Sequence, residues 1–489
     1  MRIGGLASGL DIDAMVKQLM TAEKAPLNKL NQQKQLTEWK REGYRQVSTN
    51  IVNFNNKLTN TYSLSTAIDS KTANVTGANI LTAKATGAAS NSVLNIQVNS
   101  LATASSVVSS GGTMGAKPSS TKIADINSGA TSININNVDI AISESETIDS
   151  LITKINSNKN MGVTAVYDPA TGSMSLTSKE TGQKDIKLSG GLLTDSFGLQ
   201  EANVKEGTNA LVTINGITTT QTSNKFTVNG VEISLNGTTP TGQSTQIEIV
   251  QDTDKIVETI KSFVDSYNET LSLLNQKVGE ERYRTYLPLT SEQKEAMSED
   301  EIKLWEEKAK SGMLKSDSIL TKAVSDMRTA IISDVVMADG TKVNLTQFGI
   351  TTGSYSEKGK LYIDEEKLRA AITENPDQIG ALFGQTASNS ATGSTATDGI
   401  FTKLKKINGT TLQSLSDRAG TSRYSSDLTT AFLPQSEMGN QLSEIEKRIT
   451  DMNRRLSMIE NRYYRQFTAM ETAMNKYNST SSSLASMLS

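Results

Sequence analysis

The sequence of 489 residues contains neither histidine nor cysteine. This excludes cysteine nucleophiles, Ser-His-Asp triads and metal sites built from thiolates or imidazoles, and it removes the commonest general base at neutral pH. Disulfides are excluded as well, so folding does not depend on whether the compartment is oxidising or reducing. Carboxylates and lysines remain, but they are scattered and form no catalytic pattern. We therefore expect a protein that is not an enzyme and that binds no cofactor and no metal.

Apolar side chains are scarce too: hydrophobic residues make up 36% of the chain and aromatic residues 5%. A chain of this length is expected to form several domains, because one hydrophobic core rarely serves more than about 300 residues. With so few apolar residues, much of the chain should be helix packed against partners, or polar β-structure. The net charge of −3 gives no reason to expect nucleic acid or an anionic membrane as a partner.

Long apolar runs are missing. No stretch approaches the roughly 18 apolar residues that span a bilayer, so we expect no membrane insertion. The first 15 residues, MRIGGLASGLDIDAM, lack the basic segment and apolar run of a secretory signal peptide. By these rules alone the protein would be assigned to the cytoplasm.

The glycine-rich amino terminus predicts no ligand site. Gly4, Gly5 and Gly9 follow no strand, and the phosphate-loop pattern G-x-x-x-x-G-K-[ST] is absent. Asp11 and Asp13 lie two residues apart, but capping of the helix that follows explains them more simply than a metal ion does.

The chain divides into two helical ends and a polar middle. Helical periodicity is present in roughly the first 60 residues and again from about residue 253 to the end, whereas residues from about 75 to 250 are rich in Ser, Thr, Asn and Gly. No arginine occurs between Arg45 and Arg282, which sharpens the division. The middle therefore differs from the ends in its physical chemistry.

Two apolar seams are predicted in the amino-terminal region. The first lies on one face of a helix that Pro26 ends or restarts. The second repeats in alternating steps of three and four residues, which is the heptad spacing. The first seam consists of Ile12, Met15, Val16 and Leu19, and the second of Tyr44, Val47, Ile51, Phe54 and Leu58.

The carboxyl end shows the heptad spacing over a longer stretch. Its seam consists of Leu442, Ile445, Ile449, Met452, Leu456, Ile459 and Tyr463, and after a one-residue slip it continues with Met470 and Met474. A helix over this stretch would be roughly 50–60 Å long and would need a partner helix. The partner is either the amino-terminal helix of the same chain or a bundle of several subunits, and the two arrangements are compatible.

A third seam begins near Thr253, whose hydroxyl can cap the first turn. It consists of Ile256, Ile260, Phe263, Tyr267, Leu271 and Leu274. We expect this helix to pack on the Tyr44–Leu58 helix, which would make the middle region an insertion with its two ends close together.

The middle region is predicted to be β-structure. Short alternating runs at 93–98, 132–135 and 210–214 are separated by turn pairs at 136–137, 215–216, 229–230 and 236–237. A helix is expected at 147–156, and the Ser- and Gly-rich stretch 104–120 is expected to be a loop. Because aromatic residues are nearly absent here, two or more small β-rich domains are expected.

Two terminal segments resemble the flagellar hook-associated protein 2 family, which forms the filament cap. The first covers residues 5–13, GLASGLDID, and the second covers residues 460–471, ENRYYRQFTAME. Residues 361–368, LYIDEEKL, and Leu382-Phe383-Gly384 are similar to the carboxyl-terminal domain of that family. Residues from about 131 to 182 resemble the hook-associated insertion motif of cap proteins and some flagellins. The resemblance covers nearly the whole chain.

The resemblance implies a multidomain α+β fold, in which long helical coiled-coil termini and a helical leg domain flank inserted β-rich head domains. The implied domains are a helical export segment at 1–42, the first part of the leg at 43–75, the head at 76–250, the second part of the leg at 251–436 and a coiled-coil segment at 437–489.

The resemblance also implies a function. Such a protein is exported through the hollow flagellum without a cleaved signal, and it sits at the distal filament tip as a homo-oligomeric ring, such as a pentamer. It retains flagellin and promotes its folding and insertion, as filament elongation and motility require. The implied partners are other copies of itself, flagellin, the hook–filament junction proteins and a cytoplasmic export chaperone at the carboxyl end.

Two other functions remain as alternatives. A flagellin or a hook–filament junction protein would also have helical termini around a variable middle, but the two terminal segments favour a cap. Adhesion to host glycans, alone or as a secondary role, would need exposed aromatic rings, and residues 76–250 contain only Tyr167, Phe197 and Phe226.

Overall fold

The computed structural model describes residues 11–110, 112–386 and 393–488, which form two compact units. One unit contains the residues up to Ile68 together with those from Asp254 onward, and the other contains Asp69–Thr253. The first unit is mainly helical and strands predominate over helices in the second, so the expected α+β fold class is confirmed. Residues 5–10 of the amino-terminal segment lie outside the described residues, and the finer domain boundaries stay predictions.

The first unit is mainly helical. Its helices are α1 (Ile12–Glu23), α2 (Ala25–Lys57), α3 (Ser65–Ile68), α5 (Thr253–Gly279), α6 (Ser291–Glu295), α7 (Glu299–Lys310), α8 (Ser318–Ile332), α9 (Glu365–Glu374), α10 (Pro376–Gly384), α11 (Ile400–Ala419) and α12 (Glu437–Leu488). Two small sheets pair β15 (Val335–Val336) with β16 (Lys342–Val343) and β17 (Ile350–Thr352) with β18 (Leu361–Ile363). None of the helices within the described ranges is both long and apolar enough to cross a membrane.

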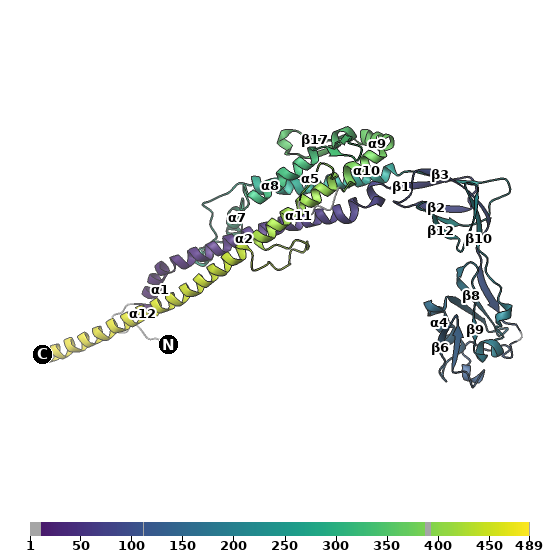
Figure 1. Ribbon diagram of the computed structural model, residues 1–489. Helices are drawn as coiled ribbons and strands as arrows, with labels where there is room; N and C mark the ends of the chain where they lie inside the picture. The colour runs from purple at the N-terminus through teal and green to yellow at the C-terminus, as the bar shows by residue number, and fades with distance from the viewer. Residues whose placement is uncertain (1–10, 111, 387–392, 489) are drawn as a thin grey trace. The chain divides into compact units, whose positions relative to one another are not determined.

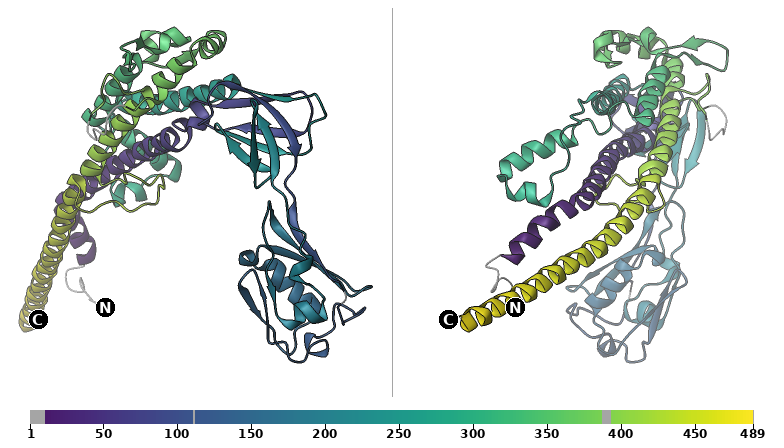
Figure 2. Two further views of the ribbon diagram at one scale, coloured as in Figure 1. Left: turned by 45° about the vertical axis from the view of Figure 1, so that its right-hand side comes forward. Right: turned by 90° about the vertical axis from the view of Figure 1, so that its left-hand side faces the viewer.

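Local signals set the helix boundaries. The Asp11 carboxylate caps α1. Pro26 occupies the first turn of α2, where backbone N–H groups have no partner within the helix, so proline costs no hydrogen bond there. Ser298 and Glu301 form a reciprocal capping box at the start of α7. Figure 1 shows α12 running along α2, and Figures 1 and 2 show its carboxyl end, in yellow, extending past α1.

A large hydrophobic core holds this unit together, and aromatic rings lie at its centre. The ring of Phe263 contacts those of Phe54, Tyr62, Phe383 and Phe401, with centroid distances of 5.0–6.4 Å. Burying each such side chain stabilises the fold by about 1.5–3 kcal/mol. The core thus joins residues that lie more than 300 positions apart in the sequence.

The second unit is built from antiparallel strands. Its strands are β1 (Lys71–Thr76), β2 (Leu81–Ala85), β3 (Ser92–Ser100), β4 (Ala104–Val108), β5 (Ser132–Ile135), β6 (Val138–Ala141), β7 (Val163–Asp168), β8 (Ser173–Thr181), β9 (Leu188–Ser189), β10 (Ala210–Ile214), β11 (Ile217–Gln221), β12 (Lys225–Val228), β13 (Val231–Leu235) and β14 (Thr245–Gln251). The sheets have the strand orders β1-β14-β3-β10-β11, β12-β13-β2, β4-β8-β7 and β6-β5-β9. Because β1 pairs with β14, the two ends of the unit lie side by side, as expected for an insertion.

Three of the four expected turns are two-residue hairpin turns. The backbone has positive φ at both residues of Asn136-Asn137, Asn215-Gly216 and Asn229-Gly230, which is the type I′ geometry that asparagine and glycine favour. Asn236-Gly237 instead leaves β13, and both of its N–H groups donate to the carbonyl of Ile80. This Asn-Gly pair closes no hairpin, because the next strand, β14, pairs with β1 and β3 and not with β13.

The expected loop at 104–120 begins with a strand, so that prediction is wrong for its first five residues. β4 pairs with β8 and has a bulge between Ala104 and Ser106. Val107 is 1% exposed, because alternate residues of β4 face the core that it shares with β8. The high serine content hid this alternation.

Residues of the unit between about 123 and 204 have a core of their own, and α4 (Ile148–Ser157) lies on it. The buried Glu146 carboxylate precedes this helix and accepts hydrogen bonds from Ser143, Ser150 and Lys154. Burial alone would raise the pKa of Glu146, but the hydrogen bonds outweigh it and the pKa lies below its usual value. The carboxylate therefore stays ionised while buried.

Candidate assembly surface

The carboxyl-terminal seam first packs inside the chain, on α2 and α11. Leu442 and Ile445 are each 9% exposed on the face of α12 that meets these helices. Lys34 of α2 pairs with Glu446 of α12 at 2.9 Å between nitrogen and oxygen. The hydrogen bond to Glu446 raises the pKa of Lys34 above its usual value. This part of the seam therefore packs on helices of its own chain, which is one of the two expected arrangements.

Further along, α12 packs against α1 in a small separate cluster. Ile12, Val16, Met20 and Leu456 are buried there. The residues packed around them are partly exposed: Leu27, Met452, Ile459, Tyr463, Tyr464 and Phe467. Two tyrosine hydroxyls cross between the helices, since Tyr463 donates to Glu23 at 3.0 Å and Tyr464 to Asp13 at 2.9 Å.

The amino-terminal seam differs from the expected one at two positions. Leu19 was expected on the packed face but is 40% exposed, and Met15 is half-buried. The buried residues Ile12, Val16 and Met20 follow one another in steps of four. The face of α1 that contacts α12 therefore includes Met20 and excludes Leu19. Met20 was missed because steps of three and four both fit a helix this short.

The last turns of α12 expose apolar side chains. Met470 and Met474 are each 36% exposed, and Ile449 higher up the seam is half-buried. Tyr477, Leu484 and Met487 are more exposed still, at 75%, 56% and 84%. The seam thus continues beyond the part of α12 that packs on α1, and this region is the candidate assembly surface.

The seams expected for the leg lie in the large core. Every one of these residues is at most 2% exposed: Tyr44, Val47, Ile51, Phe54, Leu58, Ile256, Ile260, Phe263 and Tyr267. The Tyr44 hydroxyl donates to Asp317, the residue that caps α8. Burial raises the pKa of Tyr44 most, and this hydrogen bond raises it further. These residues therefore stabilise the helical unit from within and are not available to a partner.

Sequence reasoning missed a segment that ties α11 and α12 to α2. Residues 420–436 connect the two helices. The guanidinium groups of Arg41 and Arg45 lie over the ring of Phe432, 4.1 and 3.8 Å from its centre. Arg41 also donates to the carbonyl of Ala419 at 2.6 Å, at the end of α11. The only sequence feature that could have indicated this contact is the pair of arginines four residues apart on α2. It does not indicate Phe432, which lies almost 400 residues away.

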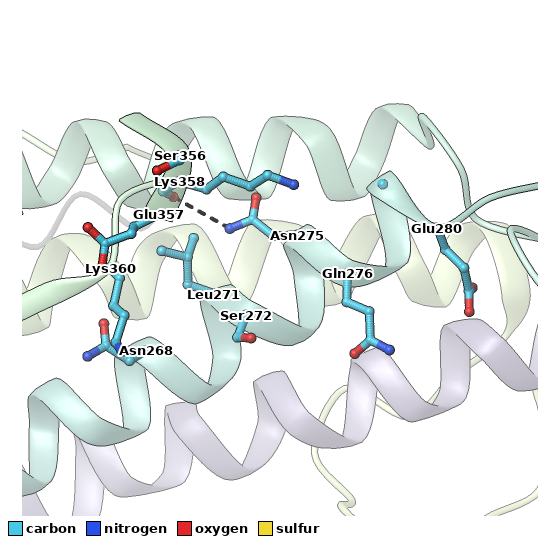
Figure 3. A pocket seen from close by; sticks show the side chains of 11 residues that line it. Asn268, Leu271, Ser272, Asn275, Gln276, Glu280, Ser356, Glu357, Lys358 and Lys360 are labelled. Atoms are coloured by element: carbon cyan, nitrogen blue, oxygen red, sulfur yellow. Dashed lines mark hydrogen bonds between the residues drawn. The ribbon is translucent and has the colours of Figure 1, made fainter. Parts of the chain in front are cut away.

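A polar groove between α5 and the residues before β18 has a structural explanation (Figure 3). The Asn268 amide donates to the carbonyl of Leu361 at 3.0 Å and accepts from its N–H at 2.8 Å. Asn275 donates to the carbonyl of Lys358 at 3.5 Å. The amides on this face of α5 therefore hold the neighbouring loop in place.

Three family models match the chain. The model described as "Flagellar hook-associated protein 2 C-terminus" matches residues 207–479, and that described as "Flagellar hook-associated protein 2 N-terminus" matches residues 8–105. The model "Flagellin hook IN motif" matches residues 125–180, which contain α4 and the strands around it. Together the matches include α1 and the part of α12 up to residue 479.

Relatives match along the full length. The chain is 33% identical to the flagellar hook-associated protein 2 of Halalkalibacterium halodurans, over 99% of each chain, and 26% identical to that of Escherichia coli, over 98% of this chain and 96% of the relative. In fold it is similar to the D1-D2-D3 domains of the flagellar cap protein FliD from Escherichia coli, with a TM-score of 0.54 and 21% identity over 78% of this chain and 97% of the other. This chain belongs to the flagellar hook-associated protein 2 family.

Proposed function

We propose that this protein forms the cap at the distal tip of a flagellar filament. It acts there as a structural homo-oligomer, such as a pentameric ring, that retains exported flagellin and promotes its folding and insertion. Filament elongation and motility would then depend on it. The observation that carries the proposal is the match over 99% of both chains to a flagellar hook-associated protein 2, with both terminal segments included.

The terminal helices support an assembly role. The α1 and α12 helices bury only one narrow stripe of side chains, and the end of α12 leaves Met470, Met474 and Met487 exposed. Methionine adapts to different partners because its side chain is unbranched and polarisable. In this proposal the exposed stripe contacts neighbouring copies after assembly and a cytoplasmic export chaperone before it. The hook–filament junction proteins are the proposed contacts when the first filament subunits are added.

Export would use the flagellar channel. A protein without cysteine can pass through an oxidising environment without forming disulfides, and the chain contains none. The family match supports the proposed location of the assembled protein, which is outside the cell at the filament tip.

Deletion of the gene in its own organism tests the proposal. Unpolymerised flagellin should accumulate in the medium, hooks should remain and filaments should be missing. Because loss of a junction protein could produce a similar leak, antibody labelling should then locate the protein at filament tips by electron microscopy. Normal filaments without leaked flagellin, in a strain shown to have no second copy of the gene, would contradict the proposal.

An additional adhesive role through sugar stacking would need exposed aromatic rings. Phe197 is 1% exposed, and Tyr167 packs edge-on against it while its hydroxyl donates to the carbonyl of Lys117. These two rings are therefore engaged inside the unit, and Phe226 is half-buried. Adhesion stays a prediction that binding of the purified protein to glycan arrays can test.

A further inference from the structure

One sheet edge in the second unit lacks the features that normally prevent strands from pairing between molecules. β11 is the last strand of the five-stranded sheet. It consists of Ile217, three threonines and Gln221, with neither charge nor proline, and its pairing with β10 has no bulge. An edge of this kind is a template for another strand, because its outward backbone groups are unpaired.

Other sheet edges of the described residues 69–253 are protected. On β7 the Asn156 amide accepts from the N–H of Ala165 and donates to its carbonyl, at 2.6 and 3.0 Å. The outer side of β4 forms a bridge between Ser106 and Lys205, and β9 is only two residues long. The remaining edge strands each contain a charged residue: Lys71 on β1, Lys84 on β2, Lys225 on β12 and Asp139 on β6.

The turn before β11 determines which of its backbone groups point outward. A two-residue type I′ turn at Asn215-Gly216 closes on a hydrogen-bonded pair, so Ile217 and every second residue after it bond to β10. The N–H and C=O groups of Thr218 and Thr220 therefore face the open edge. Both threonine side chains are exposed.

We propose that β11 pairs antiparallel with β11 of a second copy of this chain. The strand is self-complementary about Thr219: in that register, Thr218 of each copy lies opposite Thr220 of the other. The two pairs would make four backbone hydrogen bonds and join two five-stranded sheets. Threonine pairs across antiparallel strands are favourable, and no like charges meet.

The same register covers an exposed apolar side chain. Ile217 is 68% exposed, and it would lie opposite Gln221 of the second copy, whose aliphatic part can cover it. A charged strand would find no opposite charge on β11, whereas a second β11 matches it in length, polarity and register. The pairing is a contact between copies that does not depend on the filament-cap function.

Disulfide trapping tests the register. The chain has no cysteine, so an introduced cysteine is unique. In a Thr219→Cys variant the two cysteines lie on the axis in a non-hydrogen-bonded pair, with Cα atoms about 4.5 Å apart, which a disulfide can bridge. In Thr218→Cys and Thr220→Cys variants, equivalent residues are offset by two positions along the strands and lie roughly 8 Å apart, beyond the reach of a disulfide.

Full-length variants would be oxidised mildly at equal concentration and run on a non-reducing gel. We expect at least about five times more covalent dimer from Thr219→Cys than from either neighbour, which corresponds to about 1 kcal/mol. Equal yields at the three positions would indicate random collision and would overturn the proposal, as would the absence of dimer at Thr219.

A second substitution in the Thr219→Cys background separates pairing from local flexibility. Adding Thr220→Lys places a charge on the proposed contact and should reduce the dimer yield at least threefold. Adding Thr164→Lys is the matched control, because Thr164 is an exposed threonine on β7, whose edge Asn156 already covers. Circular dichroism should show both double variants folded. Equal dimer yields from the two would overturn the proposal.

Discussion

The large helical core and the terminal arm, formed by α1 and the part of α12 from Leu456 onward, use the same apolar spacing with different outcomes. In the core, Phe263 and Tyr267 are completely buried. In the arm, Ile459 and Tyr463 repeat at the same steps of three and four but remain partly exposed. The comparison shows that heptad spacing predicts which side chains face a neighbour, but not how deeply they are buried.

The number of neighbouring elements explains the difference. Around α5, side chains from α2, α8, α10 and α11 all enter one core, so several faces of the helix are covered. In the arm, α12 meets α1 along one narrow stripe. An arm of two helices has room for further helices, which is why we place the assembly surface there and not in the core.

Removing α12, including its part of the arm, should have the largest effect on assembly. A variant truncated after Gly439 loses nearly all of α12 and should sediment as a smaller species at concentrations at which the full-length protein assembles. A variant truncated after Glu471, which keeps the α1 contacts, should lose part of the assembly. Sedimentation velocity distinguishes the three proteins, and unchanged oligomers in the shorter variant would contradict the role of the arm.

Within the core, Phe263→Ala should have the largest effect on stability. The substitution leaves a cavity among four rings and should lower the free energy of unfolding by about 3–5 kcal/mol, as measured by urea denaturation. Tyr355→Ala is the control, because Tyr355 is 94% exposed and its loss should change stability by less than about 0.5 kcal/mol. A loss below about 1 kcal/mol for Phe263→Ala would show that this region is not a close-packed core.

In the arm, Leu456→Ala should act locally. It removes the buried contact of α12 with Ile12 and Val16, and we expect a loss of about 2–3 kcal/mol in the local opening free energy of α1. Hydrogen exchange of α1 amides measures this, while exchange in α5 should not change. Met458→Ala is the control, since Met458 is 60% exposed. Equal acceleration in α1 and α5 would mean that arm and core unfold together.

The smallest expected effect is that of the ion pair between Lys34 and Glu446. Replacing Glu446 with glutamine should cost less than about 1 kcal/mol, because the pair is partly exposed, and 1 M salt should reduce the difference further. The pKa of Lys34 is raised in the folded state, so the contribution is complete below the ordinary value of 10.5 and is lost as pH rises through the raised pKa. Hydrogen exchange of α12 amides or urea denaturation at pH 8 and above pH 10.5 should show this change; a difference that grows with pH would contradict it.

Much of the helical architecture could be predicted from local sequence. Tyr44, Ile51 and Phe54 repeat at helical spacing, and Pro26 and Ser298 have backbone effects that act within one turn. Asparagine and glycine pairs likewise set the hairpin turns, because positive φ strains other residues more. The terminal segments at 5–13 and 460–471 were sufficient to indicate the family.

Other features depended on contacts that no local pattern encodes. The order of β3 between β14 and β10 joins residues more than 100 positions apart, and each pairing depends on side chains of all three strands. Phe432 meets Arg41 and Arg45 because the connection after α11 folds back on α2. Met20, not Leu19, is buried because the position of α12 selects one of two faces that the α1 sequence allows equally. Local spacing was therefore enough to predict most helices and strands and most of their apolar stripes, since these depend on residues a few positions apart. Which stripes meet, and how far each is covered, depends on every neighbour at once and became visible in the folded chain.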